Sequence, residues 1–104
     1  MAINVQIQDR LARIYMSGSF NFGVHHDFKI AYTSSLANVT VRDIEIEMSK
    51  VDYMDCAALG MLMLLNERAK DAKKTVTLLN ASSVVAQMLE IANFNKIFNI
   101  RKAA

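Results

Sequence analysis

Residues 51–65 are the part of the sequence best suited to chemistry or to specific binding. A short acidic loop with Asp52 and Asp55 leads into Cys56, and a strongly apolar stretch follows. Asp55 is a good N-cap residue, which predicts that Cys56 lies in the first turn of a helix. Free backbone N–H groups and the positive end of the helix dipole can hold an added phosphate there. A thiol in that position can also be reactive.

The helix predicted from Asp55 to about residue 72 carries apolar residues on two faces. With 100° per residue, one group falls within about 40° of a common direction and forms the expected core face. That group is Ala58, Leu62, Leu65 and Ala69. The opposite side, which should be polar in a helix that covers a sheet, carries Gly60, Met63 and Leu64. A glycine there would let another backbone approach closely. The pattern fits a surface for a protein partner, and it fits equally a helix buried between neighbours or under the C-terminal segment.

Other groups that suggest catalysis or metal binding are weaker. His25, His26 and Asp27 are adjacent, so on a helix their side chains point in different directions, which favours surface or capping roles. The acids of residues 45–55 include no matched acid–base pair. Neither a GxxxxGK phosphate loop nor a GxSxG motif is present. We therefore expect no catalytic residues, no metal site, no cofactor and no enzyme activity.

Composition limits the kind of protein further. With 104 residues, 53% hydrophobic and 21% charged, the chain should fold as one domain spanning residues 1–104. A net charge of +2 gives no reason to expect nucleic acid or an anionic membrane as a partner. Cys56 is the only cysteine, so no internal disulfide can form. The N-terminus lacks signal-peptide features, and the longest apolar run, residues 61–65, is far too short to insert into a membrane. We expect a cytoplasmic protein.

The hydrophobic pattern predicts an α/β fold. Ile3, Val5 and Ile7 alternate with polar residues, as in a half-buried strand, and Asp9-Arg10 suits a hairpin turn. The expected elements are strands over residues 3–7, 11–17, 41–48 and 75–79, helices over 26–37, 55–72 and 82–92, and a short strand or helical turn over 97–100. Gly18 should end the second strand, with residues 18–23 as a loop. This order predicts a mixed β-sheet with an N-terminal hairpin, two βαβ crossovers and helices packed on the sheet.

Three separated motifs resemble those of the STAS domain family, to which bacterial anti-sigma factor antagonists belong. Residues 54–61, Met-Asp-Cys-Ala-Ala-Leu-Gly-Met, resemble the family signature Met-Asp-Ser-Ser/Ala-Gly/Ala-Leu-Gly. Gly18-Ser19-Phe20-Asn21 stands where the family has Gly-x-Phe/Leu-Asp. Residues 80–98 resemble the last strand and helix of the family, including Leu89-Glu90-Ile91-Ala92-Asn93-Phe94. The motifs follow the family's order over nearly the whole chain.

The resemblance implies a protein-binding regulator of transcription controlled by partner switching. In the family, the antagonist binds an anti-sigma factor that is often also a serine kinase. The kinase phosphorylates the serine after the aspartate, and a PP2C-type phosphatase removes the phosphate. That acceptor position is Cys56 here. The residues expected to bind the partner are Asn21, Phe22, Asp52, Met54, Asp55, Cys56, Ala57, Gly60, Met63 and Leu64.

Two departures from the family pattern bear on the switch. Cys56 has a thiol where the family has the acceptor hydroxyl, Ala57 has no hydroxyl to replace it, and Asn21 stands in place of an acid. Our hypothesis is that partner binding persists while the phosphorylation switch is absent or altered. One alternative is an accessory STAS subunit of a membrane transporter, such as a lipid-exporting ABC transporter. Another is a thiol-based redox sensor using Cys56, although no second cysteine exists to resolve a sulfenate.

Overall fold

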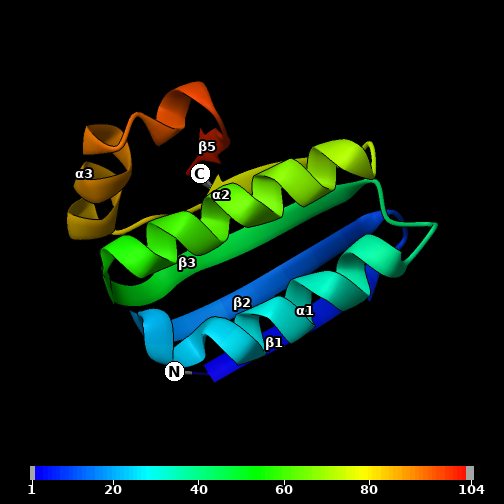
Figure 1. Cartoon of the computed structure of the whole chain (residues 1–104), viewed down its shortest axis with the longest axis horizontal. Helices are drawn as coiled ribbons and strands as arrows, with labels where there is room; N and C mark the ends of the chain where they lie inside the picture. The colour runs from blue at the N-terminus through cyan, green and yellow to red at the C-terminus, as the bar shows by residue number, and fades with distance from the viewer. Residues whose placement is uncertain (1, 103–104) are drawn as a thin grey trace.

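An antiparallel hairpin begins the chain in the computed structural model, which describes residues 2–102 (Figure 1). β1 spans Ala2–Gln8 and β2 spans Leu11–Phe20. Asp9 in the turn has a φ of 57°, a left-handed conformation that Asp adopts more readily than most residues. Ile3 and Val5 of β1 pack against the core from the edge of the sheet, as their alternation with polar residues predicts.

A single five-stranded sheet organises the rest of the chain. Its order is β1-β2-β3-β4-β5, with β1 antiparallel to β2 and all other neighbours parallel. β3 spans Asp43–Met54, β4 spans Thr75–Leu79 and β5 spans Asn99–Arg101. The crossover helices are α1 (His25–Ala37), α2 (Cys56–Asp71) and α3 (Ser83–Ile91). The 3-10 turn η1 (Phe22–Val24) precedes α1, and the 3-10 turn η2 (Phe94–Lys96) follows α3. The predicted mixed α/β fold is confirmed. A third crossover adds to the two predicted, because the C-terminal segment forms strand β5.

The core lies between the sheet and the two long helices, α1 and α2, which run side by side over one face (Figure 1). Ile14, Ile44 and Ile46 from the strands are fully buried beneath this helical layer. All four residues of the predicted core face of α2 are buried, at 0% exposure for Ala58, Leu62 and Leu65 and 1% for Ala69. α3 lies to the side, against β3. Its N-cap is Ser82, whose hydroxyl accepts a hydrogen bond from the Val85 N–H.

Strands β2 and β3 are longer than the sequence pattern predicts. Gly18 does not end β2: it takes a φ of 96° within the strand, which then continues to Phe20. β3 continues past Met48 to Met54. The two extensions pair with each other after a shift in register, with Phe20 opposite Met54. The strand ends therefore meet, and the segments that follow them, η1 and the start of α2, become neighbours.

Within the part of the chain that the structure describes, no helix is long and apolar enough to cross a membrane.

The buried face of α2 generates a first prediction. Leu62→Ala should lower the free energy of unfolding by about 2–5 kcal/mol, because it leaves a cavity under the helix where Leu62 is fully buried. Met63→Ala is the matched control on the outer face, where the side chain is 44% exposed, and should cost less than about 1 kcal/mol. Urea unfolding followed by circular dichroism measures both values. Equal losses would contradict the assignment of the two faces.

Candidate functional site

The side chain of Asp55 joins the two segments that follow β2 and β3. Its Oδ1 accepts a hydrogen bond from the Ala58 N–H at 2.9 Å, which confirms Asp55 as the N-cap of α2. Its Oδ2 accepts a second from the Phe22 N–H at 3.3 Å. The Asp55 N–H in turn donates to the carbonyl of Phe20 at 3.2 Å. One residue thus holds the η1 turn against the first turn of α2.

The η1 turn presents an aromatic side chain to solvent. Asn21 caps the turn, since its Oδ1 accepts a hydrogen bond from the Gly23 N–H at 2.8 Å. A Cβ on Gly23 would lie 2.9 Å from that same oxygen, so glycine suits the tight turn. Phe22 is 69% exposed and stacks on the ring of His25, with centroids 5.7 Å apart. The stacking orients Phe22 beside the start of α2.

A groove between α1 and α2 lies next to Phe22, and we call it the α1–α2 groove. Its cavity of about 230 Å³ is lined by Phe22, His25, Phe28, Lys29, Tyr32, Ala57, Gly60, Met61 and Leu64. Apolar side chains dominate this lining. A Cβ on Gly60 would meet nothing within 4 Å, so the glycine leaves open space along the outer side of α2. Four of the residues predicted to bind a partner therefore come together here: Phe22, Ala57, Gly60 and Leu64.

The outer face of α2 is uncovered. Met63 and Leu64 are 44% and 36% exposed, so no other part of residues 2–102 buries them. This removes the interpretation in which the helix is buried on both sides. Cys56 is the first residue of α2 and is exposed at the N-terminal end of the helix. Asp52 is exposed just before it and accepts a hydrogen bond from the Ser19 hydroxyl at 3.4 Å.

Met54 is the exception among the predicted binding residues. Its side chain is 0% exposed, so the prediction that it contacts a partner is wrong. The cause is the unexpected length of β3, because Met54 is still a strand residue. After Met48 the register with β2 shifts and the simple alternation is lost, so that Val51 and Met54 are the residues turned into the core. Its neighbour Tyr53 points outward instead and is 51% exposed.

Five residues that line the groove were not among the predicted binding residues: His25, Phe28, Lys29 and Tyr32 of α1, and Met61 of α2. His25, Lys29 and Tyr32 form the α1 side of the groove, although His25 was expected to have only a surface or capping role. Their spacing of four and then three residues is that of one helical face. This spacing is a usable signal, but only once α1 is known to lie beside α2.

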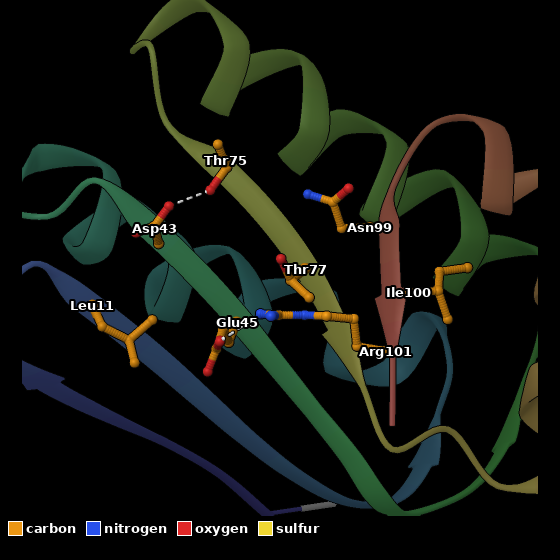
Figure 2. Close-up of a pocket in the computed structure, with 8 residues that line it drawn as sticks. All are labelled: Leu11, Asp43, Glu45, Thr75, Thr77, Asn99, Ile100 and Arg101. Carbon is orange, nitrogen blue, oxygen red and sulfur yellow. Dashed lines mark hydrogen bonds and ion pairs between the residues drawn. The ribbon is translucent and has the colours of Figure 1, made fainter. Parts of the chain in front are cut away.

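A broader hollow lies on the other face of the sheet, away from α1 and α2 (Figure 2). Figure 2 shows Glu45 near its centre, with Arg101 reaching across from β5. The Glu45 carboxylate pairs with Arg13 at 2.6 Å and with Arg101 at 3.2 Å. Hydrogen bonds from Arg13 to Tyr15 and to Glu45 raise the pKa of the guanidinium, which stays charged. Because these charges pair with each other, this face is best explained as a self-neutralised polar surface.

Metal-ligating side chains do not cluster at the α1–α2 groove or at the hollow around Glu45. Among the described residues, no three His, Cys, Asp or Glu side chains come close enough to hold a metal ion. The chemistry available beside the α1–α2 groove is that of one exposed thiol, one stacked imidazole and backbone N–H groups at the start of α2.

Comparisons with known proteins agree with the sequence motifs. The family model described as "Mlab, STAS domain" matches residues 3–101, and the chain belongs to the STAS domain family. A STAS-domain containing protein of Pseudomonas aeruginosa strain UCBPP-PA14 is 37% identical over 87 residues, which cover 84% of either chain. This family membership confirms the resemblance.

Two solved structures share the fold. An anti-sigma factor antagonist from Mycobacterium paratuberculosis has a TM-score of 0.84 and 14% identity, over 96% of this chain and 84% of its own. The Bacillus cell fate determinant SpoIIAA, in its phosphorylated form, has a TM-score of 0.78 and 12% identity, over 99% of this chain and 92% of its own. At these identities the likeness is one of fold.

The two hydrogen bonds of Asp55 generate a second prediction. Asp55→Ala should lower the free energy of unfolding by about 1–2 kcal/mol, because the Ala58 N–H loses its cap. Asp55→Asn is the matched control and should retain most of the stability, since Asn is an equally good N-cap. Urea unfolding measures both variants. If Asp55→Asn lost as much as Asp55→Ala, the cap would not be the main contribution of this side chain.

Proposed function

We propose that this chain is a protein-binding regulatory domain that docks an anti-sigma factor, or a related serine kinase-type regulator, through the α1–α2 groove and the adjoining outer face of α2. The observation that carries the proposal is the exposed apolar groove beside the first turn of α2, bordered by Phe22 and Leu64. Large apolar side chains left in water at one place on a small domain are typical of an interaction site.

The size and lining of the groove suggest how the partner binds. A cavity of about 230 Å³ has room for one or two apolar side chains of the partner, inserted over Gly60. Lys29 and His25 at the α1 side offer hydrogen bonds to polar groups at the rim. This combination of an apolar centre with a polar rim favours binding over catalysis, so we propose that the chain acts as a cytosolic binding module in transcription control and has no enzyme activity of its own.

Cys56 gives the proposal its second part, which is that serine phosphorylation does not control this surface. A phosphate at the start of α2 would add a charge of about −1.5 to −2 beside Asp52 and Asp55, next to the groove, and would disrupt docking. A thiol at that position is a poor acceptor for a serine kinase. The partner surface would then stay open without a PP2C-type phosphatase to restore it.

The docking surface generates a third prediction. A pull-down from the source cell followed by mass spectrometry should recover a soluble ATP-binding regulator rather than a membrane complex. Leu64→Lys should weaken binding of that partner by at least about tenfold, since it places a charge at the rim of the apolar groove. Ile91→Lys on α3, where the isoleucine is 82% exposed, is the control and should bind normally. A membrane complex in the pull-down would favour a transporter accessory subunit instead.

The acceptor position generates a fourth prediction. The recovered kinase-type partner, incubated with ATP, should phosphorylate Cys56→Ser and leave the unmodified chain unphosphorylated, as measured by intact-protein mass spectrometry. Phosphorylation of the unmodified chain would refute the loss of the switch.

The alternative role of Cys56 as a redox sensor has a separate test. Iodoacetamide labelling over a range of pH measures the reactivity of the thiol. A half-point near the free-thiol value would remove the redox interpretation, whereas a much lower half-point would support it.

A further inference from the structure

β1 forms an open edge of the sheet. It is seven residues long and pairs with β2 along its whole length, from Ala2 opposite Ser17 to Gln8 opposite Leu11. No strand among residues 2–102 pairs with its other side. Alternate residues of β1 therefore turn their N–H and C=O groups outward, where another strand can bind them.

This edge lacks the features by which folded proteins usually prevent strand pairing. The residues of β1 are Ala-Ile-Asn-Val-Gln-Ile-Gln, with no charge and no proline, and the pairing with β2 has no bulge. The opposite edge of the sheet is protected in contrast. β5 has only three residues, which end at Arg101.

The helix side of the β1 edge is partly apolar, with aliphatic side chains beside Asp27 and Ser34. A groove between β1 and α1, with a volume of about 340 Å³, is lined by Ile3, Val5, Asp27, Ile30, Ala31 and Ser34. Ile30 is 56% exposed, and Ile7 at the end of the strand is 43% exposed. A strand added to this edge would thus also cover apolar side chains, which contributes to binding beyond the backbone hydrogen bonds.

We propose that the occupant of this edge is a second copy of the chain, bound through antiparallel pairing of the two β1 strands about Val5. In that register, Ile3 stands opposite Ile7 of the second copy, and Asn4 stands opposite its Gln6. On the helix side of the joined sheet, the aliphatic residues of one β1 strand contact those of the other. On the open side, the Asn and Gln side chains of one strand lie beside those of the other. The pairing follows a two-fold axis, so both copies form the same contacts, and their sheets join into one.

The dimer is compatible with the proposed partner surface. The residues of α1 that border the β1 edge are Asp27, Ile30 and Ser34, whereas His25, Lys29 and Tyr32 border the α1–α2 groove. These two sets lie on different sides of α1, so both surfaces can be occupied together. A dimer would present two grooves to its partners.

Sedimentation velocity of the full chain over a concentration series from about 1 to 300 µM tests the proposal. We expect a dimer whose dissociation constant rises at least about tenfold in Ile7→Lys, because a charge on an edge strand opposes pairing. Ile91→Lys makes the same substitution at another exposed isoleucine and should leave the dimer unchanged. A monomer at every concentration, or equal dimerisation of both variants, would overturn the proposal. Circular dichroism verifies that each variant is folded.

A cross-link tests the register separately. Val5→Cys in a Cys56→Ser background places two thiols at the two-fold axis, so mild oxidation should yield a covalent dimer. Val39→Cys in the same background is the control, since Val39 is 88% exposed in the loop after α1 and should not cross-link. Equal cross-linking of the two variants, or none in Val5→Cys, would overturn pairing about Val5.

Discussion

The carboxylate of Asp55 is the interaction on which the candidate site depends. One of its oxygens binds the Ala58 N–H in the first turn of α2, and the other binds the Phe22 N–H in the η1 turn. Two segments that lie 33 residues apart in the chain are thereby held by one side chain. Together with the stacking of Phe22 on His25, this link holds Phe22 beside the start of α2, where it forms one wall of the α1–α2 groove.

The two faces of the sheet differ in what covers them and in their charge. The helix-covered face contains the core and, at its outer surface, the apolar groove proposed for binding. The other face keeps the Glu45 carboxylate between Arg13 and Arg101, so its charges are paired within the sheet. Burial of a lone charge in the sheet would be costly, and this pairing avoids it. The β1 edge differs from both faces, since its backbone groups and neighbouring isoleucines remain available for a second strand.

The features predicted well are those that neighbouring residues determine. Asp55 acts as the predicted N-cap because the side chain of a cap binds N–H groups only a few residues away. The core face of α2 follows from helical periodicity alone. The ends of β2 and β3 were predicted wrongly because strand length depends on a pairing partner distant in sequence. After the register shift, residues 50–54 find partners in residues 17–20, although their hydrophobic pattern is weak.

By itself, the sequence determined the family, the α/β order of elements and the occupation of the acceptor position by Cys56, since motif and periodicity depend on residue type and spacing. Only the tertiary structure decided which of these residues can be reached from outside. It buried Met54 at the end of a longer strand, and it added His25, Lys29 and Tyr32 as the second side of the groove. The physical reason is that exposure depends on the packing of α1 against α2 and of β2 against β3, which are contacts between distant parts of the chain.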